Sequence, residues 1–317
     1  MTTHPAAVVP NPLFTDPATE AKWRARFTAP RMSAPSWAEN APGRNLYLSN
    51  ADGVWEIYAW DRAENFHRKV TDRPNGTSHY RISPDGESIW WFADHDGDEL
   101  GLWVSEPFVP DGRDAWTAVE GVPAGYSAGL EIGEDVVGVG VSTDDGTSVW
   151  LSRKGGAAEV VYSHENDGGL DALSKDESLV VISHSEHGDS RHPALRVLSV
   201  ETGAAVAEKW DGEGKGLGTI AFSPVLGDNR VLVLHERRGR EELLLWDVET
   251  DTESEIVIDL PGEIVADWYP DATALLVVHT FEARNTLYRY HLTTGELSEL
   301  DTPHGTVGSA AVRPDGT

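Results

Sequence analysis

The clearest chemical pattern in the sequence surrounds Ser127, which lies in a G-x-S-x-G pattern at residues 125–129. In serine hydrolases this pattern exposes the serine hydroxyl on a strained turn from a strand into a helix. Residues 130–141 instead place Leu, Ile and Val in a β pattern, and no helix pattern follows. The two glycines also fall at a junction between the repeats described below. We therefore expect that Ser127 is not a nucleophile.

An acidic stretch at residues 94–99, with the sequence Asp-His-Asp-Gly-Asp-Glu, resembles a calcium loop at first sight. A helix–loop–helix calcium site needs ligands at alternating positions, Gly at the sixth position and a distant bidentate Glu. Here Gly is fourth, and the stretch joins two predicted strands. Residues 144–146 form a similar acidic turn. We interpret both as solvated hairpin tips and expect neither a metal nor a cofactor.

The richest polar segment is residues 184–193, which contain three His together with Glu, Asp and Ser. These types could form a metal site or a catalytic triad, although triad members normally come from separate elements. Residues 235–242 and 281–285 are predicted to be the same loop in the next two repeats. We expect these loops to form one rim that contacts substrate, with the candidate residues Glu186, His187, Asp189, Arg191, Arg237, Arg238, Glu282 and Arg284. Exposed, salt-bridged side chains are the alternative interpretation of each.

The elements that position these loops repeat along the chain. An apolar anchor followed by a Ser-Pro-Asp-Gly-like turn recurs with spacings of 43 to 49 residues, at Trp37, Ile82, Leu130, Leu173, Phe222, Trp268 and Val312. A second marker, an apolar strand ending in a polar residue, follows each of the first six anchors, as in residues 57–61 and 243–247. We interpret it as the third strand of each unit. This period, with four short strands per unit, is typical of β-propeller blades.

The predicted fold is therefore all-β: a seven-bladed β-propeller with six complete four-stranded blades and the start of a seventh. The blades are predicted at about residues 35–75, 76–121, 122–167, 168–215, 216–261 and 262–304, with a partial blade at 305–317. Helical repeats of similar length would need apolar residues at a spacing of 3.6, which these units lack. Glycines near the boundaries fit tight crossings between blades.

An N-terminal extension, residues 1–34, precedes the first blade and is predicted to contain a short helix. Asp16 is a good N-cap and Pro17 suits the first turn, so the helix is expected to run to about Phe27. Trp23 and Phe27 lie four residues apart and therefore share one face. The predicted blades have mostly polar edges, which are poor packing partners for this aromatic helix face.

The 317 residues carry a formal net charge of −28 and no cysteine. The acidic residues are spread over all repeats, which favours a solvated surface and disfavours binding to nucleic acid or to an anionic membrane. A more specific interpretation is that this negative charge attracts cationic ligands. Without cysteine there is no disulfide, and no apolar stretch approaches membrane-spanning length. We expect a cytoplasmic protein.

The chain resembles the N-terminal propeller of the prolyl oligopeptidase family of serine peptidases, nearest its acylaminoacyl-peptidase-like bacterial branch. The resemblance covers about residues 12–317 and rests on residues 83–86 and their copies, on the strand ends at 58–61 and 287–291, and on the leading helix. TolB-like propellers share the Ser-Pro-Asp-Gly turn. The leading helix and the lack of a secretion signal favour the peptidase.

This resemblance implies a seven-bladed propeller that narrows access to an α/β-hydrolase domain, so that only short peptides or aminoacyl amides reach the nucleophile. It also implies that the catalytic triad lies in that C-terminal domain, on which the leading helix packs. No catalytic residue can be assigned within these 317 residues. Because the seventh blade stops just after its turn, we expect the chain to be part of a longer polypeptide. A stand-alone, TolB-like scaffold that binds a ligand or a protein is the alternative.

Overall fold

The computed structural model describes residues 14–110, 117–302 and 305–317, and these are folded almost entirely as antiparallel β-structure. Sheet one consists of β1 (Ser36–Trp37), β2 (Arg44–Ser49), β3 (Glu56–Asp61) and β4 (Phe66–Lys69). Sheet two consists of β5 (Tyr80–Ile82), β6 (Ser88–Asp94), β7 (Leu100–Pro107) and β8 (Thr117–Ala118). Sheet three consists of β9 (Gly125–Ile132), β10 (Val136–Thr143), β11 (Gly146–Arg153) and β12 (Glu159–His164). Sheets two and three are hydrogen-bonded to each other where β7 pairs with β9.

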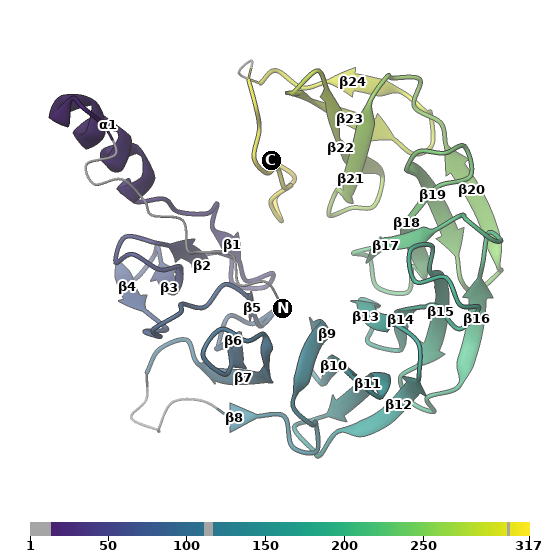
Figure 1. Ribbon diagram of the computed structural model, residues 1–317. Helices are drawn as coiled ribbons and strands as arrows, with labels where there is room; N and C mark the ends of the chain where they lie inside the picture. The colour runs from purple at the N-terminus through teal and green to yellow at the C-terminus, as the bar shows by residue number, and fades with distance from the viewer. Residues whose placement is uncertain (1–13, 111–116, 303–304) are drawn as a thin grey trace, which may run out of the picture.

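Three further sheets follow in the same order of strands. They are sheet four, with β13 (Gly168–Leu173), β14 (Leu179–His184), β15 (Ala194–Ser199) and β16 (Ala205–Lys209); sheet five, with β17 (Leu217–Phe222), β18 (Arg230–His235), β19 (Glu242–Asp247) and β20 (Thr252–Ile256); and sheet six, with β21 (Glu263–Trp268), β22 (Ala274–Phe281), β23 (Arg284–His291) and β24 (Leu297–Glu299). Figure 1 shows the six sheets around a common centre, with the first strand of each innermost and the fourth outermost.

The hydrophobic core lies between the sheets. Each neighbouring pair of sheets shares one apolar cluster, because alternate residues of a strand point to opposite faces. Between sheets four and five, for example, Val181 and Leu195 pack against Val233, Leu244 and Trp246. Every interior sheet is therefore apolar on both faces, which explains why the third strands predicted from the sequence read as nearly continuous apolar runs.

Among the described residues, one face of sheet one and one face of sheet six have no such neighbouring sheet. On sheet six, Tyr269 and Leu276 pack against Ala310 and Val312 from residues 305–317. On sheet one, Tyr47, Tyr58 and His67 stack on one another, with ring centroids 5.3 to 5.8 Å apart, on the face opposite the shared cluster. Figure 1 shows residues 305–317 running between these two sheets.

Two of the recurring turns have the same set of side-chain hydrogen bonds. In sheet two, Ser83 Oγ donates to Asp85 (2.6 Å) and accepts from the amide of Ser88 (2.9 Å), and sheet four repeats this arrangement at residues 174–179. Residues 313–317 have Arg in place of the serine and repeat the backbone part of this turn: the Gly316 amide donates to the Arg313 carbonyl at 2.8 Å, as the Gly86 amide donates to the Ser83 carbonyl at 2.9 Å. The turn therefore forms in the seventh copy, although no strand is paired there among the described residues.

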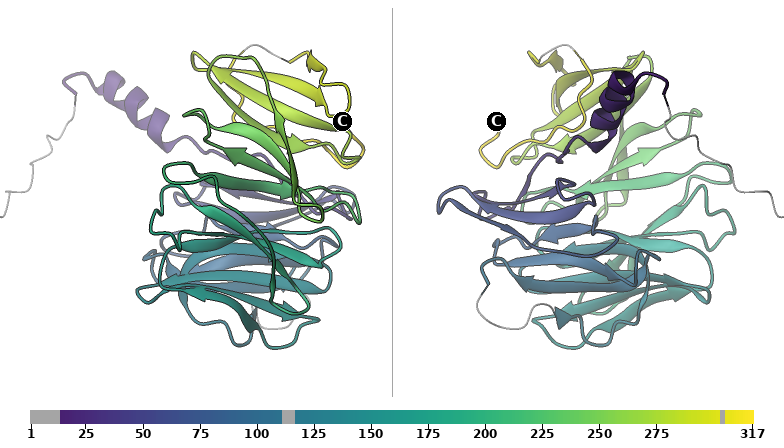
Figure 2. Two further views of the ribbon diagram at one scale, coloured as in Figure 1. Left: turned by 90° about the vertical axis from the view of Figure 1, so that its right-hand side faces the viewer. Right: turned by 60° about the vertical axis from the view of Figure 1, so that its left-hand side comes forward.

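The helix α1 (Pro17–Thr28) confirms the prediction from Asp16 and Pro17. The Asp16 carboxylate caps it by accepting from the amides of Ala18 and Thr19, each at 3.1 Å. No residue of α1 is buried, and Figure 2 shows that the helix projects from the sheets. Trp23 and Phe27 are in contact, with ring centroids 5.0 Å apart.

Residues 1–13 of the expected N-terminal extension lie outside the described residues. Among the residues that are described, no helix has the length and apolar character needed to cross a membrane. The all-β prediction and the six third strands are confirmed.

One anchor prediction is wrong by two residues. In sheet three, Ile132 pairs with Val137 as Ile82 pairs with Ile89 in sheet two, so the anchor is Ile132 and not Leu130. The turn between β9 and β10 is shorter than the Ser-Pro-Asp-Gly turns, and this shifts the end of the first strand.

Replacing Trp246 by Ala should destabilise the protein by about 3–5 kcal/mol, because this fully buried side chain fills the space between sheets four and five. Chemical denaturation followed by circular dichroism measures the change. Trp210, which is 51% exposed, provides the matched control. A loss in Trp246→Ala no larger than that in Trp210→Ala would contradict packing between the sheets as the main source of stability.

Candidate functional site

The sheets present two different faces of the molecule to solvent. Because the strands are antiparallel, the turns from first to second strands lie on one face, here called the turn face. The loops from second to third strands lie on the other, here called the helix face, where β1 begins and from which α1 projects (Figure 2). All eight candidate residues lie in the loops of the helix face, or at the start of a strand that follows one.

In sheet four the candidate side chains bind one another or nearby structural residues. Glu186 forms a two-point ion pair with Arg196 at 2.6 and 3.0 Å, which lowers the pKa of the Glu186 carboxyl to about 2. Asp189 accepts from the ring of His192 at 2.7 Å. The ring of His187 packs at a tilt of 31° against that of Trp210, with centroids 4.9 Å apart, and Arg191 is exposed.

In sheet five the two candidate arginines belong to an ion-pair network. Arg237 binds both oxygens of Asp211, at 2.6 and 2.8 Å, and also reaches Glu253 and Glu255. Arg238 pairs with Glu255 at 2.8 Å and with Glu242. These charges are already neutralised inside the protein, so they stabilise the loop more readily than they bind a ligand.

In sheet six the loop is a two-residue turn, with Glu282 and Ala283 both in the left-handed region (φ 50° and 59°). Glu282 and Arg284 are exposed, and neither has an ion-pair partner within the described part of the chain. The eight candidates therefore share one face but do not converge on one point.

Ser127 lies within the strand β9, and its surroundings explain the G-x-S-x-G pattern. Its Oγ accepts a hydrogen bond from the indole nitrogen of Trp103 at 2.9 Å. A Cβ atom on Gly125 would lie 2.4 Å from a methyl group of Val141, and one on Gly129 would lie 2.0 Å from the carbonyl oxygen of Leu170. Both glycines are thus required by close contacts between strands. The strand-to-helix turn of a nucleophile elbow is absent at this position.

The innermost strands carry charged residues that lie close enough to influence one another. Arg81 and Glu131 occupy equivalent positions, each one residue before the end of its first strand, in β5 and β9. Asp171 lies at a bulge of β13 and accepts from Ser183 Oγ at 2.9 Å. Burial raises the pKa of Asp171 to about 6. Burial also raises the pKa of Glu131 to about 7, an effect opposed by the charge of Arg81 and reinforced by that of Asp171.

Contacts across the centre connect turns of non-neighbouring sheets on the turn face. Lys175 of sheet four forms an ion pair with Glu39 of sheet one, and Asn40 donates to Glu134 of sheet three at 3.1 Å. A cavity of about 810 Å³ lies among these turns, and a second of about 490 Å³ is lined by the inner strands β1, β5 and β9. The turns of sheets one, three and four thus partly bridge the central opening.

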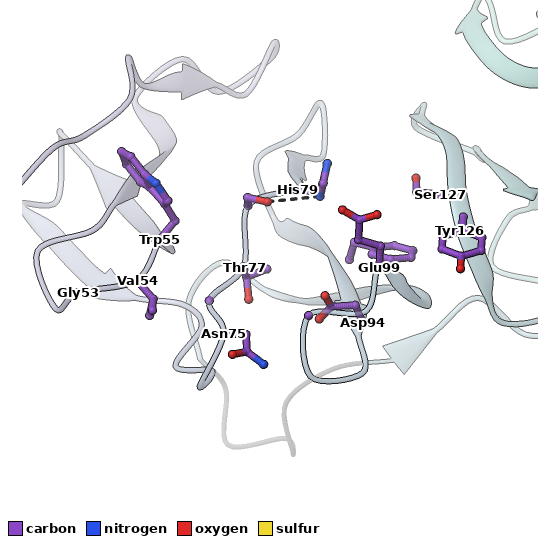
Figure 3. A pocket seen from close by; sticks show the side chains of 14 residues that line it. Gly53, Val54, Trp55, Asn75, Thr77, His79, Asp94, Glu99, Tyr126 and Ser127 are labelled. Carbon is purple, nitrogen blue, oxygen red and sulfur yellow. Dashed lines mark hydrogen bonds between the residues drawn. The ribbon is translucent and has the colours of Figure 1, made fainter. Parts of the chain in front are cut away.

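A third cavity, of about 600 Å³, opens on the helix face where sheets one, two and three meet (Figure 3). Its lining comes from the loop after β2, the crossing from sheet one to sheet two, the end of β6 with the loop that follows it, and the start of β9. The residues are Gly53, Val54, Trp55, Asn75, Gly76, Thr77, Ser78, His79, Phe92, Asp94, Gly97, Glu99, Tyr126 and Ser127. We call it the three-sheet pocket. The sequence analysis did not identify it, although it singled out residues 94–99 and Ser127, which supply part of its lining.

No protein-family model matches the sequence, and no curated protein matches it. Solved structures do match. A chain from a study of two prolyl endopeptidases aligns with a TM-score of 0.68 and 14% identity, over 90% of this chain and 46% of its own length. TolB from Acinetobacter baumannii aligns with a TM-score of 0.51, 13% identity and coverages of 87% and 55%. A putative TolB from Agrobacterium tumefaciens aligns with a TM-score of 0.50 and 14% identity, over 79% of this chain and 91% of its own length.

The chain has a β-propeller fold. Its six sheets are blades of this propeller, and its apolar clusters are the contacts between blades. The chain spans less than half the length of the prolyl endopeptidase chain that it matches. At 13–14% identity these likenesses establish the fold and leave the activity of this propeller to be argued from its own residues.

Replacing Glu131 by Gln should raise the free energy of unfolding relative to wild type, and this gain should be larger at pH 8 than at pH 5. The gains at the two pH values should differ by about 2 kcal/mol. The folded-state pKa of about 7 lies above the ordinary value of 4.5, so the proton on Glu131 stabilises the fold at low pH and is lost as the pH rises through 7. Denaturation at both pH values measures this, with Glu64→Gln on an exposed turn as control. Equal differences at the two pH values would contradict the burial of this carboxyl.

Treatment of the 317-residue chain with a fluorophosphonate should leave Ser127 unmodified, because its hydroxyl accepts from Trp103 within a strand and lies outside any nucleophile elbow. Intact-mass spectrometry measures the adduct, and a serine hydrolase of known activity in the same tube serves as the positive control. An adduct that disappears in Ser127→Ala would overturn this assignment.

Proposed function

We propose that this chain is the substrate-gating propeller of a cytoplasmic serine peptidase or amidase of the prolyl oligopeptidase family, in its acylaminoacyl-peptidase-like branch. The substrates would be short peptides or aminoacyl amides, and the catalytic triad would lie in a C-terminal α/β-hydrolase domain of the same polypeptide. The observation that carries the proposal is the position of residues 305–317, which lie between sheets six and one and form the turn of a seventh repeat.

A seventh blade would complete the contacts that sheets one and six lack. Ala310 and Val312 already pack on sheet six where the innermost strand of the next blade would lie. On the other side, Arg313 and Pro314 line a small cavity together with Trp37 and Trp60 of sheet one. Three further strands after this turn would cover the stacked rings of Tyr47, Tyr58 and His67 on sheet one, and this supports a seven-bladed ring.

The helix face is the side on which we place the hydrolase domain. The helix α1 projects there with Phe27 64% exposed and Trp23 beside it, and no blade among the described residues buries either ring. An apolar surface of this kind, beside the point where the chain enters the propeller, suits packing against another domain. The eight candidate residues and the three-sheet pocket would then face the catalytic domain.

Contacts on the turn face support a gating role. The ion pair of Lys175 with Glu39 and the hydrogen bond from Asn40 to Glu134 connect turns across the centre, so a chain entering there must pass between them. Together with the charged inner strands, they would exclude large or folded substrates. Exposed ion pairs contribute about 1 kcal/mol or less, so such a barrier could open transiently.

A stand-alone scaffold is the second candidate, favoured by the putative TolB, 91% of whose length is covered by this chain. Isolating the native protein from its source cells distinguishes the two. The peptidase proposal predicts a chain well above 34.5 kDa, labelled by a fluorophosphonate at a serine beyond residue 317. A stable 34.5 kDa protein that takes no label would overturn the proposal and support the scaffold.

Gating predicts a dependence of the native enzyme's kcat/KM on substrate size. A short peptide amide should be cleaved at least 100-fold faster than the same scissile sequence placed inside a long unfolded protein, because the propeller admits only small chains. Chromogenic assay and gel electrophoresis measure the two rates. Equal cleavage of both substrates would contradict the gating role while leaving the peptidase assignment in place.

A further inference from the structure

We propose that the three-sheet pocket is a binding site for an organic ammonium ion that carries an apolar body, such as an arylalkyl amine. The proposal rests on residues of sheets one, two and three and is independent of whether a hydrolase domain follows. It is carried by the combination of a cavity, aromatic walls, an exposed serine hydroxyl and one carboxylate without an ion-pair partner in the described part of the chain.

The size and walls of the pocket suit a small amphipathic ligand. Its volume of about 600 Å³ lies within the range of about 300–1,000 Å³ typical of small-molecule sites. Phe92 is buried at its base, and Tyr126 is 46% exposed at its edge. Trp55 contributes a third ring, whose own cation contact is already supplied by Arg31 at 5.5 Å. The rings of Phe92 and Tyr126 therefore provide the surface for the apolar body.

The charge of the pocket favours a cation. Asp94 is neutralised by Arg73 at 2.8 Å, whereas Glu99 has no ion-pair partner among the residues that the structure describes. Figure 3 shows Glu99 between Thr77 and His79 on one side and Tyr126 and Ser127 on the other. An ammonium ion beside Glu99 would gain a charge-assisted hydrogen bond, and an anion there would be repelled.

The backbone holds Glu99 at this position. Its φ of 65° is in the left-handed region, which non-glycine residues rarely adopt. The Asp98 carboxylate accepts from the amide of His95 at 3.2 Å and from that of Leu100 at 3.0 Å, so both sides of the turn are tied to one side chain. The carboxylate of Glu99 is therefore presented on an ordered turn.

One hydroxyl group adds to the acceptors available to an ammonium ion. Ser127 is exposed, and its Oγ accepts from Trp103 and retains a second lone pair. Thr77 also lines the pocket, but its Oγ1 is fully buried and does not face the bound ion. An ammonium group has three donors and no acceptor, which suits Glu99 and Ser127.

Calorimetric titration of the 317-residue chain with phenethylamine tests the proposal, with phenylacetate as the probe of the same ring and opposite charge. We expect phenethylamine to bind one site with a Kd on the order of 1 mM, and phenylacetate not to bind. Glu99→Gln should weaken phenethylamine binding at least tenfold, and Tyr126→Ala should weaken it several-fold. Glu99 is exposed, so its replacement should leave the fold intact, as circular dichroism can verify.

Glu282→Gln is the matched control, because Glu282 is also an exposed glutamate with a left-handed backbone on the helix face, but in sheet six. It should leave phenethylamine binding unchanged. Equal binding of phenylacetate, undiminished binding to Glu99→Gln, or an equal loss in Glu282→Gln would each overturn the proposal. The last outcome would attribute binding to the overall negative charge rather than to this pocket.

Discussion

Face-to-face packing of small, twisted sheets is the interaction on which the rest of this structure depends. Each sheet of four short strands is too small to be stable alone, and it gains stability by burying an apolar face against the next sheet. Trp246, fully buried between sheets four and five, and Phe222 beside it show how much of each contact comes from a few large side chains. One face of sheet one and one face of sheet six do not pack against another described sheet, so these two faces lack that stabilising contact.

Packing also decides which polar residues remain available for function. Crowding of the inner strands explains the glycines around Ser127, so a pattern that suggests hydrolase chemistry serves the approach of neighbouring strands. In sheets four and five the loops of the helix face are long enough to fold back, and Arg237 binds carboxylates of its own surroundings. Near sheets one to three the crossing and loops leave a pocket instead, and Glu99 has no ion-pair partner there among the residues that the structure describes.

Features set by residues close together in the sequence were predicted correctly, whereas the pocket, which depends on contacts between distant residues, was missed. The repeats, the third strands and the cap at Asp16 were predictable because period-two alternation, turn residues and capping all act within a few residues. The pocket was not, since Trp55, Glu99 and Tyr126 come from three sheets, and their meeting depends on how those sheets pack. Residues 94–99 were interpreted as a solvated tip, which is correct for His95 but overlooks the lining role of Glu99. The two-residue error at Leu130 arose because turn length was inferred from other repeats.

The central claim is that sheets one and six are separated by the width of one further sheet. Because the chain has no cysteine, pairs of introduced cysteines can carry spin labels on equivalent exposed turns: Glu64 in sheet one, Thr202 in sheet four, Glu249 in sheet five and Thr294 in sheet six. Pulsed electron resonance on the native protein then compares three distances. The account predicts that the 64–294 distance equals the 202–294 distance, which spans two steps of the ring. A 64–294 distance equal to that of the neighbouring pair 249–294 would contradict it.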